Sequence, residues 1–112
     1  MVDDHAAFRT SARRLLELTG YEVVGEAGDG ASGLALVRDL QPELVLLDVA
    51  LPDMSGFDVA DALAGSPSAV VLVSSRDPAD LGRRARKSGA LGFIAKDRLS
   101  EETIREVVGR GR

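Results

Sequence analysis

An aspartate directly follows an unbroken apolar run near the middle of the chain. Asp48 comes after Leu44–Leu47, and residues 49–53 have the composition of a loop. Such runs are typical of strands buried on both faces of a parallel sheet, and ligands bind beyond the carboxyl ends of those strands. Asp48 could therefore present a nucleophilic or metal-binding carboxylate, and a strand-ending aspartate that caps a turn is the alternative.

An acidic pair, Asp3 and Asp4, stands close to the start of the chain. It can be a solvated helix start, because acidic residues are favoured at the positive end of a helix dipole. If a first strand lies beside Leu44–Leu47, however, the pair comes next to Asp48. Three neighbouring carboxylates repel one another unless a cation enters, and Mg²⁺ prefers such oxygen ligands.

Two further polar residues follow apolar runs. Ser74 comes after Val70–Val73, where its hydroxyl could donate to a phosphoryl oxygen, although a turn serine is the simpler interpretation. Lys96 comes after Phe93-Ile94-Ala95 in a chain whose basic residues are nearly all arginine. Its ammonium could pair with a carboxylate or a phosphate, and an ordinary exposed lysine is the alternative.

The elements that must position these residues alternate along the chain. Apolar runs at 21–24, 44–47, 70–73 and 91–94 predict strands, and helical spacing predicts helices over Phe8–Leu18, Ala31–Leu40, Phe57–Leu63, Asp77–Gly89 and from Ser100 onward. This alternation predicts an α/β fold with a parallel sheet covered on both faces. The first strand would be Met1-Val2, which is shorter than the usual five or so residues. We expect either a few residues upstream in the natural chain or a genuine two-residue strand.

Length and composition exclude several classes of protein. The 112 residues predict one domain over 1–112, and the net charge of −4 argues against nucleic acid binding through the overall field. The absence of cysteine excludes disulfides and thiolate chemistry, and the single histidine excludes a histidine-rich metal site. The sequence has no membrane-spanning run and no secretory signal, so we expect a cytoplasmic domain that makes no membrane contact.

Two other patterns have ordinary explanations. Gly28, Gly30 and Gly33 match the G-x-G-x-x-G pattern of dinucleotide sites, but the chain lacks the second half of such a fold. We interpret them as a turn and a helix start. A basic run on the fourth predicted helix is either a solvated face or a docking surface for an acidic partner; it comprises Arg83, Arg84, Arg86 and Lys87.

Taken together, these residues match one family. The chain resembles the receiver domain of two-component response regulators over essentially its whole length, through Asp3-Asp4-His5, residues 46–56, residues 71–75 and residues 92–96. The resemblance implies a flavodoxin-like (βα)5 fold with strand order 2-1-3-4-5. It also implies a bacterial, cytoplasmic signalling protein that is not an enzyme in the usual sense, because it catalyses only its own phosphorylation and dephosphorylation.

The resemblance assigns a role to each site residue. Asp48 is the expected phosphoacceptor, and Asp3, Asp4, Asp48 and the backbone carbonyl of Ala50 are the expected Mg²⁺ ligands, with Asp4 the more direct of the acidic pair. Ser74 is the expected switch hydroxyl, Lys96 the partner of the phosphoryl group, and Phe93 the aromatic residue coupled to Ser74. Where many receivers have a cis-proline after the lysine, this chain has Asp97, so the geometry of that bond is open.

The expected activity is Mg²⁺-dependent transfer of a phosphoryl group from a phosphohistidine to Asp48. The donor would be a sensor histidine kinase or a phosphotransfer protein. The signal would leave through the face formed by the fourth helix, the last strand and the last helix, toward an unknown output partner, a fused effector or a second copy of the chain. A receiver that is not phosphorylated and acts as an interaction module is the main alternative. A phosphatase is disfavoured because Ala50 stands where that class has a second acid, and a nucleotide-binding fragment rests only on the glycines.

Overall fold

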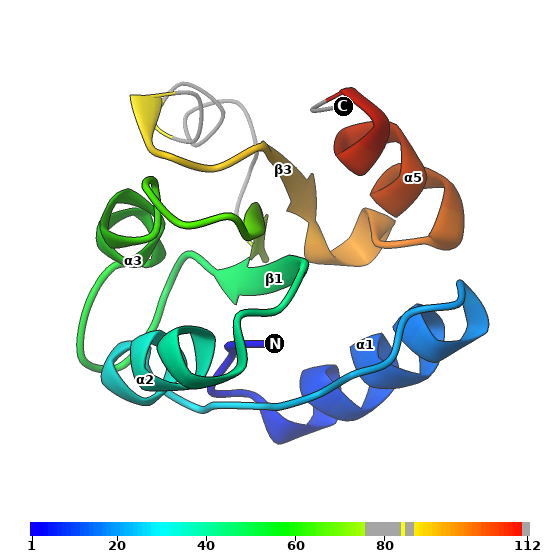
Figure 1. Ribbon diagram of the computed structural model, residues 1–112. Coiled ribbons are helices and arrows are strands. Elements are labelled where there is room, and N and C mark those ends of the chain that lie inside the picture. Colours follow the sequence, from blue (N-terminus) through cyan, green and yellow to red (C-terminus); the bar gives the residue numbers. More distant parts are fainter. Residues whose placement is uncertain (76–83, 85–86, 111–112) are drawn as a thin grey trace.

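The computed structural model describes residues 1–75, 84 and 87–110 (Figure 1). The predicted start of the fourth helix at Asp77-Pro78 lies outside these residues, as do Arg83 and Arg86 of the basic run. Arg84 and Lys87 are described and are helical. Among the described residues, no helix has the length and apolar character needed to cross a membrane.

A three-stranded parallel sheet forms the centre of the molecule. Its strands are β1 (Leu44–Asp48), β2 (Ala69–Ser74) and β3 (Gly92–Ala95), in the order β1-β2-β3. Asp48 pairs with Val73, and Ser74 pairs with Ala95. The α/β prediction is confirmed, and the register aligns the carboxyl ends of all three strands along one edge of the sheet.

The prediction of five strands is not met by the described residues. Residues 21–24 form no strand, and the first segment contributes only two isolated parallel bridges, which join Val2 to Ala27 and to Leu47. Val2 thus lies between the segment that ends at Ala27 and β1, as the order 2-1-3-4-5 requires of the first strand. Neither bridge extends into a ladder. Val2 pairs with Ala27 in parallel register, so Met1 lies opposite the residue just before Ala27 and does not reach residues 21–24.

Helices cover both faces of the sheet, as expected for this alternation (Figure 1). They are α1 (Ala6–Leu18), α2 (Gly30–Leu40), α3 (Gly56–Ala62) and α5 (Glu101–Arg110), with a 3-10 turn over Lys96–Arg98. Alternate strand residues face opposite cores: Leu47 and Leu72 pack with α2 and α3, and Leu46 and Val71 pack with α1 and α5. This division explains why the runs are apolar at every position rather than at every second one.

The glycines of the G-x-G-x-x-G pattern form a turn and the first residues of α2, as predicted. Asp29 caps this helix, because its side chain accepts a hydrogen bond from the Ser32 amide at 2.7 Å. Asp53 accepts from the amides of Gly30 and Ala31 at 2.7 and 3.0 Å. The amides that would bind a phosphate in a nucleotide site are therefore bound by carboxylates of the chain itself.

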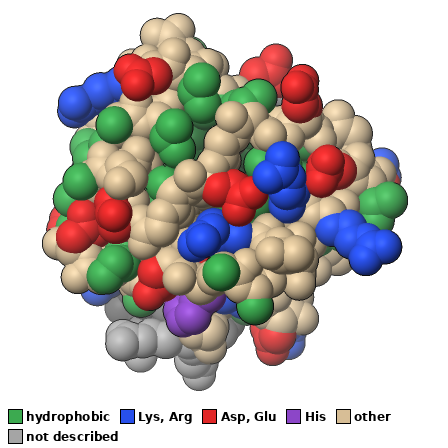
Figure 2. All heavy atoms as spheres, turned by 90° about the horizontal axis from the view of Figure 1, so that it is seen from below, with side chains coloured by type: hydrophobic (Ala, Val, Ile, Leu, Met, Phe, Trp, Pro, Cys, Tyr) green, Lys and Arg blue, Asp and Glu red, His purple; other side chains and the backbone are tan. Residues whose placement is uncertain are grey.

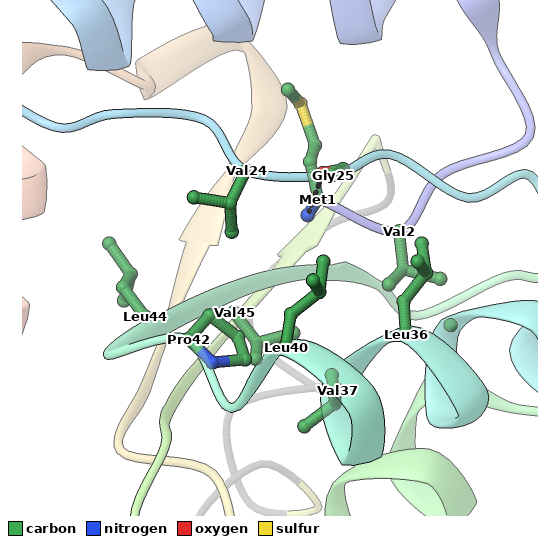
Figure 3. Close-up of a pocket in the computed structure, with 11 residues that line it drawn as sticks. Met1, Val2, Val24, Gly25, Leu36, Val37, Leu40, Pro42, Leu44 and Val45 are labelled. Atoms are coloured by element: carbon green, nitrogen blue, oxygen red, sulfur yellow. Dashed lines mark hydrogen bonds between the residues drawn. The ribbon is translucent and has the colours of Figure 1, made fainter.

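A small apolar pocket lies where Met1 and Val2 meet α2 and the beginning of β1 (Figure 3). Its volume is about 40 Å³, far below the several hundred Å³ of a typical ligand pocket. The Met1 ammonium donates to the Gly25 carbonyl at 3.2 Å, and burial lowers the pKa of this amine. The pocket lies at the amino end of β1, away from the edge where Asp48 lies.

The outer surface of the α1 side carries charges of both signs. Figure 2 shows this side from below, with acidic and basic side chains interspersed. Arg13 pairs with Glu17 in the same helix and with Glu26, at 3.6 and 2.6 Å. This mixture fits a solvated surface rather than a field that attracts nucleic acid.

Gly33 allows α2 to approach the first segment closely, which holds Val2 in place. A Cβ atom at Gly33 would lie 2.8 Å from both methyl groups of Val2. We predict that Gly33→Ala lowers the free energy of unfolding by about 1–2 kcal/mol, because overpacking outweighs the better helix propensity of alanine. Urea denaturation measures the change.

Two variants control this prediction. Gly65→Ala should leave stability nearly unchanged, since a Cβ atom there has no neighbour within 4 Å. Adding Val2→Ala to Gly33→Ala should recover part of the loss, because it removes the two methyl groups. If Gly33→Ala unfolds at the same urea concentration as Gly65→Ala, the close contact does not constrain the first segment.

Candidate functional site

The sheet brings the predicted site residues together at its carboxyl edge. Asp48 is the last residue of β1 and Ser74 the last of β2, while Lys96 directly follows β3. Asp3 reaches the same edge because Val2 is hydrogen-bonded to β1: its amide donates to Leu46, and its carbonyl accepts from the Asp48 amide. One ligand atom from each of four residues lies within 4.8 Å of the others; the residues are Asp3, Asp4, His5 and Asp48.

Asp3 is the most deeply buried acid of this group, with 1% of its surface exposed. Its Oδ1 accepts a hydrogen bond from the His5 amide at 2.8 Å, and its backbone carbonyl accepts one from the Arg9 guanidinium. Its Oδ2 lies 2.7 Å from the Lys96 ammonium. The charge of this buried carboxylate is therefore compensated by the lysine.

Asp48 is buried beside Asp3, with 2% of its surface exposed. Its Oδ1 accepts from the Ala50 amide at 3.3 Å, and its Oδ2 lies 3.4 Å from Lys96 Nζ. Burial raises the pKa of Asp48, and the negative charge of Asp3 raises it further, while Ala50 and Lys96 act in the opposite direction. The ionised form of Asp48 is therefore destabilised in this pocket.

Lys96 is held between the two acids rather than exposed at the surface. Its side chain is 13% exposed, and its ammonium contacts Asp3 Oδ2 and Asp48 Oδ2. The ammonium also lies 4.4 Å from the centre of the Phe8 ring, over its face. The bond to Asp97 is trans, since the described residues include no cis peptide. The lysine is therefore fixed by α1 as well as by β3.

The loop after β1 is tightly tied to the strand. Gly56 donates to the Val49 carbonyl at 2.7 Å, and a Cβ atom at Gly56 would collide with the backbone carbonyl of Asp48. Ala50 and Ser55 form an isolated antiparallel bridge within the loop. The hydrogen bonds from Gly30 and Ala31 lower the pKa of Asp53, the opposite direction to Asp48. The loop thus rests on α2 and fixes the backbone around Asp48.

Ser74 and Phe93 lie on the neighbouring strands β2 and β3. Ser74 is 2% exposed, and its Cα partner in the register is Ala95. Phe93 is half-buried against the core shared with α2 and α3. It also borders a surface depression of about 240 Å³ between β3 and α5. A side chain in that position contacts both the interior and an accessible face.

The donor set fits a hard divalent cation. The carboxylates of Asp3, Asp4 and Asp48 lie together, and the Lys96 ammonium contacts two of them, Asp3 and Asp48. Oxygen-rich sites of this kind are those that Mg²⁺ uses, with several waters completing the shell. Asp4 is the more exposed acid of the pair and Asp3 the more buried, so Asp4 is better placed toward water.

Some residues of the pocket were not assigned a role from the sequence. His5 directs Nδ1 toward the acids, Phe8 lies under the ammonium of Lys96, and Asp53 anchors the loop to α2. Phe8 contacts Lys96 from a distant part of the sequence, so local patterns do not encode that contact. The role of Asp53 depends on a contact with residues 23 positions earlier in the chain, which local patterns do not encode.

Comparison with known proteins agrees with this geometry. The family description "Response regulator receiver domain" matches residues 1–108. BvgA of Bordetella pertussis, named as a positive transcription regulator of virulence factors, is 36% identical over 110 residues, which are 96% of this chain and 51% of the relative. A protein-glutamate methylesterase of Geobacter sulfurreducens is 40% identical over 116 residues, covering 98% of this chain and 31% of the relative.

A solved structure has the same fold over nearly the whole chain. The signal receiver domain of NarL from Mycobacterium tuberculosis superimposes with a TM-score of 0.88 at 39% identity, covering 99% of this chain and 94% of that domain. The chain spans about half the length of the transcription regulators that it matches. The fold is thus that of the flavodoxin-like receivers, and the chain belongs to the family of response regulator receiver domains of two-component systems.

Proposed function

We propose that this receiver is active in phosphoryl transfer and that Asp48 is its phosphoacceptor. The observation that carries the proposal is the burial of Asp48 beside Asp3 with Lys96 Nζ 3.4 Å away. Because ionised Asp48 is destabilised, its free energy falls when its charge is shared with an incoming phosphorus centre and neutralised by neighbouring cations. The donor is a phosphohistidine of a sensor histidine kinase or phosphotransfer protein, or a small acyl phosphate.

The proposed step is an in-line displacement at phosphorus. An oxygen of Asp48 forms the new bond to phosphorus, the P–N bond of the donor breaks, and the donor imidazole leaves with the electron pair and takes up a proton. Lys96 pairs with a phosphoryl oxygen, and the tied loop after β1 holds Asp48 in one orientation. A bound Mg²⁺, held by Asp3, Asp4, Asp48 and the carbonyl of Ala50, supplies charge neutralisation. Attack by water later returns Asp48 to its free form.

The proposed output runs from Ser74 to Phe93. Phosphorylation adds about −1.5 to −2 charge and new acceptor oxygens, toward which the Ser74 hydroxyl moves. The space that it leaves admits Phe93, which borders the depression between β3 and α5. The face that includes β3 and α5 then changes shape for an output partner, a fused effector domain or a second copy of the chain.

The proposed setting is the bacterial cytoplasm, in keeping with the bacterial regulators among the relatives. We propose that residues 1–112 form one domain that contacts neither nucleic acid nor membrane itself. DNA binding would belong to a separate effector region; the relatives named as transcription regulators are about twice as long as this chain. The domain catalyses only its own phosphorylation and dephosphorylation. A receiver that is not phosphorylated and works as an interaction module is the alternative that the first experiment excludes or supports.

Incubation with acetyl phosphate and Mg²⁺ should add one phosphoryl group, measured as the intact mass. The gain should disappear in Asp48→Asn and in the presence of a chelator, because both the nucleophile and the cation are required. Asp39→Asn is the matched control, since it makes the same chemical change at an exposed position of α2 and should still be phosphorylated. A folded protein that gains no mass under any condition would favour the interaction module.

Asp48→Asn and Asp53→Asn should change the free energy of unfolding in opposite directions when no divalent cation is present. The raised pKa of Asp48 means that the folded state loses stability as pH rises from about 4 through the raised value. At pH 7, Asp48→Asn should therefore raise the free energy of unfolding by roughly 0.5–2 kcal/mol, as expected when a strained functional charge is removed. Well below pH 4, where the carboxyl is protonated in both states, this gain should vanish.

Asp53→Asn should lower stability at pH 7, because the lowered pKa of Asp53 reflects a carboxylate that stabilises the folded state when ionised. That contribution is lost as pH falls through the lowered pKa. Chemical denaturation of the three proteins at both pH values, with a chelator present, measures all of these differences. Equal losses in the two variants at pH 7 would contradict the assigned electrostatics.

A further inference from the structure

His5 directs a ring nitrogen into the acidic pocket. Its Nδ1 lies 3.1 Å from Asp3 Oδ1 and 3.1 Å from Asp4 Oδ1, and 4.0 Å from Asp48 Oδ2. The Lys96 ammonium lies 3.5 Å from the same nitrogen. The side chain is nevertheless 64% exposed, so the rest of the ring faces solvent, and Figure 2 shows the histidine at the surface of the molecule.

The backbone holds the ring in this position. The amide of His5 donates to Asp3 Oδ1 at 2.8 Å, which closes a tight turn just before α1. His5 is the N-terminal boundary residue of that helix, but its side chain makes no capping hydrogen bond to it. The imidazole therefore contacts the carboxylates and does not cap the helix.

The resulting donor set mixes nitrogen with oxygen. Carboxylates alone suit Mg²⁺, whereas an imidazole nitrogen favours first-row transition ions such as Mn²⁺, Co²⁺ and Ni²⁺. Receiver domains typically bind Mg²⁺, and the acidic cluster beside His5 is the group of described residues that could hold a cation here. His5 is the one group among the four neighbouring ligand residues that can distinguish these ions chemically.

We propose that His5 Nδ1 is an additional cation ligand, which gives this receiver tighter binding of borderline transition ions than its carboxylates alone would give. The inference rests on the proposed function only in using the same cation pocket. It extends that function by naming the class of ion that can support it. The competing explanation is that Nδ1 carries a proton and serves as an internal counter-ion, which a cation must displace.

Calorimetric titration of the unphosphorylated, tag-free chain with Ni²⁺ and, separately, with Mg²⁺ tests the proposal. His5 is the single histidine of the sequence, so no other imidazole can bind Ni²⁺. His5→Ala should weaken Ni²⁺ binding by at least about tenfold and change Mg²⁺ binding by less than about twofold. Asp48→Asn is the control for the pocket and should weaken both ions. The absorption spectrum of bound Co²⁺ should change in His5→Ala but remain in a control variant of the exposed Arg14→Ala.

The outcomes separate this inference from the proposed function. If His5→Ala changes neither ion while Asp48→Asn weakens Mg²⁺, the cation pocket stands and the role of His5 is wrong. Tighter Mg²⁺ binding in His5→Ala would identify the counter-ion and overturn the proposal. Ni²⁺ binding that depends on His5 but not on Asp48 would show a lone surface imidazole, which also overturns it. A wild-type chain that binds neither ion contradicts both proposals.

Discussion

The structure depends on one electrostatic constraint, the burial of two neighbouring carboxylates with a single ammonium between them. Asp3 and Asp48 are almost fully removed from water, and Lys96 contacts both. Like charges in such surroundings disfavour ionisation, and the raised pKa of Asp48 expresses that cost. A fold would not keep this arrangement for stability alone, because an apolar pair of similar volume is often as stable or more so. The electrostatic cost instead favours the binding of positive charge, whether a cation or the electron-poor phosphorus of a donor.

The surrounding elements hold this arrangement in place. Parallel register brings the ends of β1, β2 and β3 to one edge, and two hydrogen bonds of Val2 to β1 carry Asp3 there. Gly56 lets the following loop pack against the Asp48 backbone, and Asp53 ties that loop to α2. Phe8 of α1 restrains the ammonium from the other side. Each contact limits the ways in which the carboxylates could relax apart, so a ligand meets an arrangement that is already formed.

Much of this arrangement follows from the sequence, because strand-end positions are set by local patterns. The apolar runs, two of them unbroken, predicted β1, β2 and β3, and the residues after them converge as a parallel sheet requires. The prediction of a strand over 21–24 was wrong for the described residues, since pairing there depends on partners that the local pattern does not reveal. The contacts of Phe8 with Lys96 and of Asp53 with α2 could not be derived either, because they join segments whose relative position arises only from tertiary packing. The contacts of His5 with Asp3 and Asp4 are local, but the direction of its ring is set only in the folded chain.

The most direct test is the titration of the Asp48 side-chain carboxyl, followed by carbon NMR with and without Mg²⁺. The account predicts a pKa above the ordinary value for aspartate in the metal-free protein, caused by burial and by Asp3. It also predicts a large fall of that pKa when Mg²⁺ is present, because the cation stabilises the ionised form. A carboxyl that titrates at the ordinary aspartate value, unchanged by Mg²⁺, would contradict the claim that buried charge repulsion organises this site.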